Sequence, residues 1–231
     1  MEYGKLIQGV FLERLNRFVA RVRVGDEELN VHVRNTGRCR ELLVPGNAVY
    51  LLKSENPDRK TPYDLIAVER GDGRLINMDS LAPNRAAAEW LAVGGLGALE
   101  NLRAEVKLGD SRFDFGAEEA GRRVLIEVKG CTLEENGVAR FPDAPTLRGL
   151  KHVRELAALA RAGNRCAILI VIQMKGVHTF QPNWATHPEF GEALIDAREA
   201  GVEIVAMDCE VCPGKVKIDQ PVAVDLTRPK E

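Results

Sequence analysis

The chain has 231 residues, enough for one large domain or two small ones. Its 32 lysines and arginines nearly balance 34 aspartates and glutamates, so nucleic-acid binding would have to come from local basic patches rather than overall charge. No apolar run approaches the length that crosses a bilayer, and the N-terminus lacks the apolar core of a signal peptide. The five cysteines lack a disulfide-scaffold spacing. We therefore expect a cytoplasmic protein that has no membrane partner.

Residues 1–80 are expected to form a small β-barrel. Apolar and polar residues alternate over 18–24 and again over 29–34, on either side of Gly25-Asp26, which is typical of a hairpin with one buried face. Turns rich in glycine, proline and asparagine separate three further β-rich runs, at 48–53, 64–69 and 75–78. Short strands with such turns favour an OB-like barrel.

Residues 81–231 are expected to form a mixed-sheet α/β domain. It begins with a helix at 85–91, and three strands follow at 104–108, 112–116 and 122–128. Apolar residues recur at helical spacing from Thr146 to Ala162, and Gly163 supplies the stop. The last expected elements are a buried strand, a helix and a strand that closes the sheet, at 167–172, 189–200 and 202–207. The domain boundary is expected near 78–86, and the path of 221–231 stays open.

Two short stretches carry the most informative charges, Arg112-Phe113-Asp114-Phe115 and Leu125-Ile126-Glu127-Val128-Lys129. Side chains two apart on a strand point to the same side, so Glu127 and Lys129 are expected to share a face. Asp114 lies 13 positions before Glu127, a spacing that suits an antiparallel hairpin. Two converging carboxylates can hold a divalent cation, and a lysine beside them can favour negative charge on a phosphate. The pattern indicates metal-dependent phosphodiester cleavage.

The alternative is a solvated strand face with an ordinary ion pair, because such short patterns often arise by chance. Val124, Leu125, Ile126 and Val128 surround the charges with apolar residues, which indicates a central strand. Charges in that position cost several kcal/mol unless they are paired or bound to metal. Glu127 and Lys129 are therefore either a partly buried pair or part of an active site.

Basic residues at two places are candidates for contact with nucleic acid. In the barrel they are expected on one face of the hairpin and in the loop beyond it, at Arg21, Arg23, His32, Arg34, Arg38 and Arg40. A basic sheet face can follow a nucleic-acid backbone, although few aromatic residues are available here for base stacking, and an ordinary wet face is the alternative. The helix from Thr146 adds Arg148, Lys151 and His152 near its start. A solvated helix face, with Lys151 and Glu155 as an i,i+4 pair, is the alternative there.

The order of elements, with Asp on one strand and Glu-x-Lys on the next, resembles the αβββαβ core of the PD-(D/E)XK nuclease superfamily. Over residues 1–225 the chain more closely resembles the sugar fermentation stimulation protein (SfsA) family. The matching segments are Asn35-Thr36-Gly37, Pro45-Gly46, Glu105-Val106-Lys107, Arg112-Phe113-Asp114-Phe115, Ile126-Glu127-Val128-Lys129 and Phe141-Pro142-Asp143-Ala144, with Arg148-Gly149-Leu150-Lys151-His152 after the last of these.

The resemblance implies an OB-like nucleic-acid-binding domain at 1–80 and a nuclease-like domain at 81–231. It also implies a DNA-binding protein linked to the regulation of sugar utilisation. The superfamily pattern makes Asp114 and Glu127 metal ligands and Lys129 the catalytic lysine, and we expect the Val128 carbonyl to hold the metal with the two acids. Glu89 and Glu105 compete for the place of a further acid, and Glu105 is favoured because it lies in a matching segment. We therefore expect Mg²⁺ or Mn²⁺ as cofactor and DNA as partner.

Two functions from different classes stay open. The first is a metal-dependent nuclease that acts on DNA or RNA. The second is a non-catalytic DNA-binding transcriptional regulator that retains a nuclease fold. The complete trio Asp114, Glu127 and Lys129 favours the nuclease, since a fold kept only for binding has no chemical need of it. A homodimer is also considered, because many nucleic-acid enzymes act in pairs.

Overall fold

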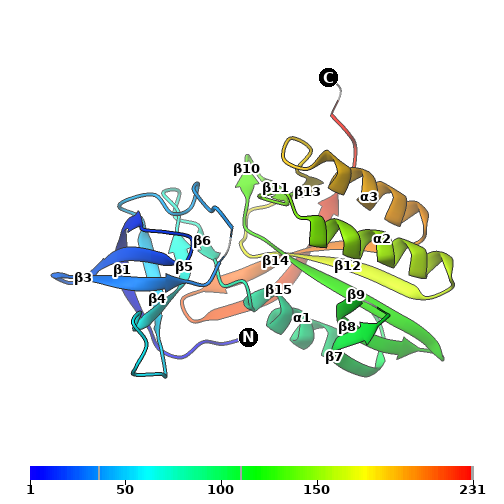
Figure 1. Cartoon of the computed structure of the whole chain (residues 1–231), viewed down its shortest axis with the longest axis horizontal. Helices are drawn as coiled ribbons and strands as arrows, with labels where there is room; N and C mark the ends of the chain where they lie inside the picture. The colour runs from blue at the N-terminus through cyan, green and yellow to red at the C-terminus, as the bar shows by residue number, and fades with distance from the viewer. Residues whose placement is uncertain (36, 110, 230–231) are drawn as a thin grey trace.

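The computed structural model describes residues 1–35, 37–109 and 111–229. Thr36, from the matching segment Asn35-Thr36-Gly37, and the last two residues of the expected second domain lie outside the described residues. Two lobes lie side by side, and the C-terminal lobe holds α1, α2 and α3 (Figure 1). Within the described ranges no helix is long and apolar enough to cross a membrane.

The N-terminal lobe is a closed barrel, as the sequence predicts. Its strands are β1 (Leu6–Arg14), β2 (Val19–Val24), β3 (Glu27–Val33), β4 (Ala48–Lys53), β5 (Tyr63–Glu69) and β6 (Leu75–Asn77). They pair in the order β3-β2-β1-β4-β5-β6, and β3 also pairs with β5 in parallel, which closes the sheet. The sequence pattern missed β1 because its apolar residues are adjacent, as in Leu6-Ile7, rather than alternating.

The C-terminal lobe is a mixed sheet covered on both faces. Its helices are α1 (Ala82–Ala92), α2 (Leu147–Arg161) and α3 (Pro188–Glu199). Its strands are β7 (Glu100–Leu108), β8 (Ser111–Glu119), β9 (Arg122–Cys131), β10 (Glu134–Glu135), β11 (Val138–Phe141), β12 (Arg165–Ile172), β13 (Thr179–Pro182), β14 (Glu203–Cys212) and β15 (Lys215–Val224). The strand order is β10-β11-β13-β15-β14-β12-β9-β8-β7. α1 packs on one face of the sheet, and α2 and α3 pack on the other (Figure 1).

The expectation that the strand at 202–207 closes the sheet is wrong. β14 pairs with β15 on its far side, and β15 is followed by β13, β11 and β10. Pro221 lies inside β15, and a proline ordinarily argues against a central strand, so the local pattern did not predict that the sheet extends there. Residues 221–224 are thus part of the sheet.

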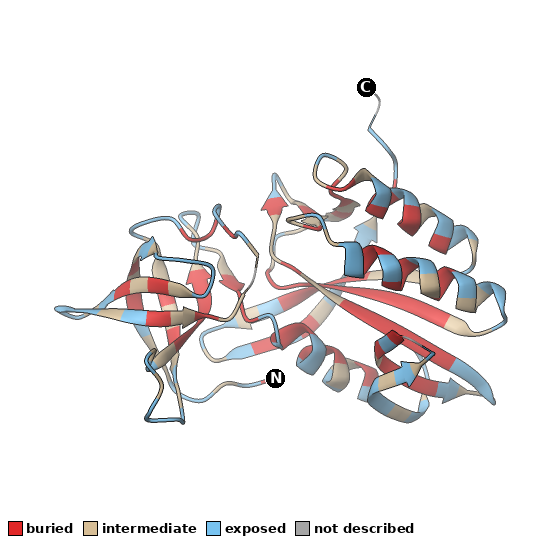
Figure 2. Cartoon of the chain, viewed as in Figure 1, coloured by how far each residue is buried: buried red, intermediate tan, exposed pale blue. Residues whose placement is uncertain are grey.

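The centre of this sheet explains why a charged strand can be held there. β12 is almost wholly apolar and buried, and it pairs in parallel with β9 on one side and β14 on the other (Figure 2). β9 is also bonded to β8, so it is an interior strand whose middle residues are buried. Glu127 lies opposite Ile168 of β12 in this register. Its carboxylate is therefore carried into the interior by apolar neighbours.

Buried polar contacts join the two lobes. Gln173, which follows β12, donates from Nε2 to the Asn77 carbonyl at 3.1 Å, to Asn77 Oδ1 at 2.9 Å and to the Asp79 carbonyl at 3.1 Å. Glu134 is also buried, and its Oε2 accepts from Arg70 at 2.6 Å and lies 3.0 Å from Arg74. Since buried polar groups are costly unless paired, these contacts hold the lobes in one arrangement.

Candidate active site

Glu127 is the most unusual buried group of the C-terminal lobe. It is 3% exposed, and its Oε1 contacts both Lys129 Nζ and Nδ1 of His152 from α2. Its other oxygen, Oε2, is buried without a hydrogen-bond partner, and it is one of two such side-chain atoms in the described part of the chain. Native structures pair nearly all buried polar atoms, so an unpaired carboxylate oxygen is an exception that calls for a physical explanation.

Asp114 is held beside Glu127 by two hydrogen bonds. The ladder between β8 and β9 ends at the pair of Phe115 and Ile126. Just beyond it, the Val128 amide donates to Asp114 Oδ2 at 2.7 Å. Asn84 of α1 donates to Asp114 Oδ1 at 2.8 Å. The carboxylate therefore takes the place of a backbone acceptor and is fixed against the strand that carries Glu127.

The pleat of β8 is interrupted at Asp114. Phe113 belongs to the core beneath α2, with its ring 6.1 Å from that of His152, whereas Phe115 belongs to the core beneath α1. Residues two apart on a regular strand share a face. On the neighbouring strand β7, Glu105 lies between the residues paired with Phe113 and Phe115, and its φ is 54°. Such irregularities re-aim side chains next to functional sites.

The structure confirms that Glu127 and Lys129 share a face, since their side chains form an ion pair. The Lys129 side chain is 15% exposed, so it lies at the edge of the buried site. The structure brings Lys129, Glu127 and His152 into direct contact and links Asp114 to them through the Val128 amide. These four side chains come from β8, β9 and α2.

Glu105 and Glu89, the two candidates for a further acid, lie elsewhere. The Glu105 side chain is 68% exposed and its Oε2 lies 3.5 Å from Arg112, because the positive φ turns it away from the sheet centre. Glu89 Oε2 accepts from the amino group of Met1 at 2.6 Å. Among the residues that the structure describes, no group of three or more His, Cys, Asp or Glu lies close enough to hold a metal ion. The expected third carboxylate is therefore not at the site.

Two residues of the site were missed or misplaced by the sequence analysis. Asn84 lies outside the helix expected at 85–91. The observed helix, α1, begins earlier because Pro83 is favourable in a first helical turn. His152 was expected at the surface as a nucleic-acid contact, but it is 6% exposed and bonded to Glu127. Its spacing from the buried Gly149 and Leu156, three residues before and four after, could have placed it on the buried stripe of α2.

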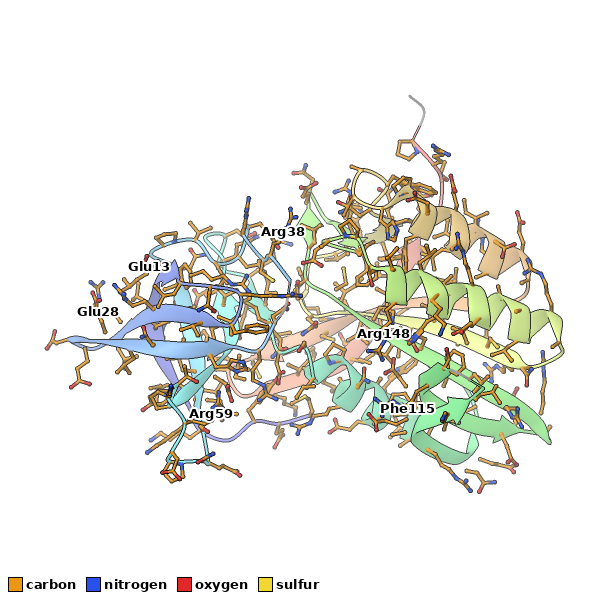
Figure 3. The ribbon with its side chains drawn as sticks, viewed as in Figure 1. Glu13, Glu28, Arg38, Arg59, Phe115 and Arg148 are labelled. Carbon is orange, nitrogen blue, oxygen red and sulfur yellow. The ribbon has the colours of Figure 1, made fainter. Side chains whose placement is uncertain are left out.

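The other basic residues of α2 lie on the surface near this site. Arg148 is exposed in the first turn of the helix, and no acidic partner within ion-pair distance is found for it among the described residues (Figure 3). Lys151 Nζ lies 3.6 Å from Glu155 Oε1, the i,i+4 pair that was the alternative interpretation. Arg148 is thus a cation of this helix that is available to a phosphate.

The basic residues of the barrel do not form one basic face. The expectation that Arg34 is a surface contact is wrong, because its side chain is 17% exposed and its Nε lies 3.3 Å from Asp79. Arg21 pairs with Glu13 at 3.1 Å, and Arg23 lies opposite Glu28 in the β2–β3 register. The hairpin face therefore mixes both signs of charge. Among the expected barrel residues, Arg38 and Arg40 stand apart in the loop after β3, where both are exposed.

Cys131, at the end of β9, is the thiol of the site strand. It is 1% exposed, and burial raises its pKa to about 12. Its Sγ donates to the Arg140 carbonyl at 3.2 Å. Since the thiolate is the nucleophilic form, this cysteine is inert at neutral pH and the chemistry of the site belongs to its oxygen and nitrogen groups.

The barrel and the mixed sheet, with an acid and a lysine on its interior strand, define a class of protein built from an OB-like domain and an α/β domain. The family described as "SfsA N-terminal OB domain" matches residues 12–78, and "Sugar fermentation stimulation protein RE domain" matches 81–215. The chain belongs to the sugar fermentation stimulation protein (SfsA) family.

Relatives support this assignment along the whole chain. The sugar fermentation stimulation protein homolog of Desulfitobacterium hafniense (strain Y51) is 49% identical over 226 residues, covering 98% of this chain and 99% of the relative. The homolog of Ruminiclostridium cellulolyticum is 48% identical over 227 residues, covering 98% and 100%. The solved structure of Pyrococcus furiosus SfsA in complex with Ca²⁺ is 31% identical, with a TM-score of 0.86 over 97% of this chain and 98% of that one.

Proposed function

We propose that this protein is a divalent-metal-dependent nuclease that cleaves phosphodiester bonds in DNA. The observation that carries the proposal is the buried Oε2 of Glu127, which has no protein partner although Oε1 is shared by Lys129 and His152. A carboxylate kept only for stability would be expected to have both oxygens paired. The unpaired oxygen belongs to the residue before Val128, whose amide fixes Asp114, and a cation would complete it.

The donor set suits a hard cation. Asp114 and Glu127 would hold it together with the Val128 carbonyl, and oxygen ligands of this kind favour Mg²⁺ or Mn²⁺. Both oxygens of Asp114 already accept one hydrogen bond each, but a carboxylate has about four acceptor positions, so it can still bind metal. The Pyrococcus furiosus relative was solved with Ca²⁺, another oxygen-seeking cation. A bound cation would supply a Lewis acid that makes water more acidic and offsets charge on the phosphate.

The remaining residues of the site orient the two carboxylates and balance their charge. The Lys129 ammonium at the site edge can stabilise negative charge that develops on a phosphate oxygen. His152 holds Oε1 of Glu127 and so leaves Oε2 to the ligand. Asn84 and the Val128 amide fix the orientation of Asp114, as outer-shell hydrogen bonds do for metal ligands. Exposed Arg148 can contact the substrate backbone.

A cleavage assay tests this proposal. Labelled single- and double-stranded DNA and RNA are incubated with Mg²⁺, Mn²⁺ or EDTA, using wild type, Glu127→Gln and Lys129→Ala. We expect metal-dependent cutting of DNA by wild type and a loss of about a thousandfold, about 4 kcal/mol, in both variants. Glu105→Gln is the matched control, since it removes an exposed acid from neighbouring β7 and should leave the rate unchanged. Cutting that persists in EDTA or in Glu127→Gln contradicts the proposal.

The second candidate is a DNA-binding regulator without catalytic activity. It is favoured by the small ligand set, because among the described residues no group of three or more His, Cys, Asp or Glu is placed to hold a metal ion. It also fits the name of the relatives, which refers to stimulation of sugar fermentation. Binding of DNA by wild type, Glu127→Gln and Lys129→Ala alike, with no cutting under any condition, would establish this function instead.

A further inference from the structure

Residues of both lobes line a small cavity next to the proposed active site. Its volume is about 180 Å³, and its polar lining includes Asn35 from the barrel and Gln173 from the other lobe. Gly130 lines it immediately after Lys129, and Pro83 lines it immediately before Asn84. The inner end of the cavity therefore adjoins the backbone that carries the proposed catalytic residues.

A larger, basic hollow adjoins this cavity. Its volume is about 570 Å³, and it is lined by Arg14, Asn16, Arg17, Gly37, Arg38, Arg40 and Ala144. Gly37 belongs to the walls of both hollows, so they meet at this residue. Ala144 comes from the C-terminal lobe, so this hollow also lies between the lobes. Together the two form a path from an arginine-lined entrance to the neighbours of Lys129.

The loop that carries the entrance arginines is fixed by contacts from both lobes. Arg14 donates to the Gly37 carbonyl at 2.9 Å and to the Asn35 carbonyl at 3.1 Å, so its guanidinium stabilises the conformation of the loop. From the other lobe, Asp143 Oδ2 accepts from the Arg38 amide at 3.2 Å. A Cβ on Gly37 would lie only 2.4 Å from that same oxygen, so the close approach of the loop requires glycine. The loop is preorganised, which lowers the entropy cost of binding.

Arg38 and Arg40 differ from Arg14, Arg21 and Arg34 of the barrel, whose guanidinium groups are paired within the fold. Both side chains are exposed, and within the described ranges neither has a carboxylate at ion-pair distance. Arg38 lies on the side of the barrel that faces the C-terminal lobe, whereas Glu28, at the hairpin tip, lies at the far end of the barrel (Figure 3). The free positive charge is thus placed at the entrance of the path.

We propose that a single strand of DNA runs between the lobes, with its phosphates on Arg38 and Arg40 and one nucleotide entering the small cavity beside Gly130. The inference rests on the proposed nuclease function. Arginine guanidinium groups bind phosphate in bidentate geometry. At about 180 Å³ the cavity is much smaller than the basic hollow of about 570 Å³, so we assign one nucleotide to the cavity and the phosphates that precede it to the hollow. Basic grooves of OB-folds follow single strands in the same way.

The test measures binding without cleavage. The full chain is titrated in EDTA against labelled single-stranded and duplex oligonucleotides, and fluorescence anisotropy is recorded over a range of salt. Arg38→Ala/Arg40→Ala should bind the single strand more weakly, and its log–log salt slope should fall by about 1.4, since each phosphate contact contributes about 0.7. Arg38→Lys/Arg40→Lys should keep most of the slope. The control Arg103→Ala/Arg123→Ala removes two exposed arginines outside the path and should retain the wild-type slope.

Each failure has a separate signature. Equal slopes for Arg38→Ala/Arg40→Ala and the control overturn the path while leaving the nuclease function intact. Duplex binding that depends on Arg38 and Arg40 as strongly as single-strand binding overturns the assignment of a single strand. Absence of single-strand binding by wild type overturns the path, whereas the proposed nuclease function fails only if the cleavage assay shows no metal-dependent cutting.

Discussion

Two buried carboxylates, one in each lobe, show opposite arrangements. Asp64 of the barrel is 7% exposed, and both its oxygens are occupied: Arg59 donates to Oδ1 at 2.9 Å and to Oδ2 at 3.2 Å, and His32 Nδ1 lies 2.8 Å from Oδ1. Glu127 is buried as deeply, yet one of its oxygens has no partner. Asp64 is a completed structural ion pair, whereas Glu127 keeps one oxygen without a partner among the described residues.

The pKa of Asp64 shows why its arrangement stabilises the barrel. Burial by itself raises the pKa of Asp64, but the hydrogen bonds from Arg59 and His32 outweigh it and lower the pKa below its usual value. The ionised carboxylate therefore stabilises the barrel. A buried acid that is left partly unpaired costs stability, and such a cost is retained where a bound ligand can offset it.

The largest expected effect on stability comes from breaking the Asp64 cluster. Asp64→Asn leaves Arg59 and His32 without their charge partner and should lower the free energy of unfolding by about 3 kcal/mol. That corresponds to a fall in Tm of about 6–12 °C. Asp58→Asn, in the exposed loop before β5, is the control and should change stability by less than about 0.5 kcal/mol. Equal Tm values for the two variants would show that the Asp64 cluster does not stabilise the barrel.

Metal binding should raise the stability of the fold through Glu127 and not through Asp64. Mg²⁺ or Mn²⁺ at about 100 times Kd should stabilise wild type by about 2.7 kcal/mol, because the ion binds only the folded chain. Thermal-shift titrations should show this gain in Asp64→Asn as well, and should not show it in Glu127→Gln. A shift that survives in Glu127→Gln would place the metal elsewhere.

A smaller effect is expected from Asn84. Asn84→Ala removes the hydrogen bond to Asp114 Oδ1 and should weaken metal affinity about tenfold, or about 1.4 kcal/mol, as is usual for outer-shell partners. Mn²⁺ titration monitored by electron paramagnetic resonance measures this directly. Arg85→Ala, the next residue of α1, is the matched control, and identical affinities in the two variants would remove Asn84 from the site.

The smallest effect is a dependence on acid pH. Because the folded pKa of Asp64 is lower than its unfolded value of about 3.9, its stabilisation is present above about pH 4 and is lost as pH falls through the folded pKa. The stability gap between wild type and Asp64→Asn should therefore narrow from about pH 4 downwards. Urea unfolding at pH 7, 5, 4 and 3 measures the gap, and a gap that stays constant to pH 3 would contradict this assignment.

Local patterns were sufficient for much of the fold. The run 48–53 was predicted with the bounds that β4 has, and the interior position of β9 followed from the apolar residues around Glu127. Patterns failed where side chains did not alternate or where a proline interrupted the strand, as in β1 and β15. The two-domain architecture was therefore predictable, while the width and edges of the second sheet were not.

The residues of the candidate site were likewise predictable in part, where a local pattern was enough. Glu127 and Lys129 lie two residues apart on one strand, and the period-two geometry of a strand is enough to bring them together. Asp114 is placed through its contact with the Val128 amide, at an interruption in the pleat of β8. Asn84, His152, Arg34 and Glu105 took their roles only from the tertiary structure. An asparagine on α1 becomes a partner of Asp114, and Arg34 turns inward to Asp79, through contacts between segments distant in sequence. A pattern within one strand can specify which residues face the same side, but which of them stay unpaired depends on how helices and lobes pack around them.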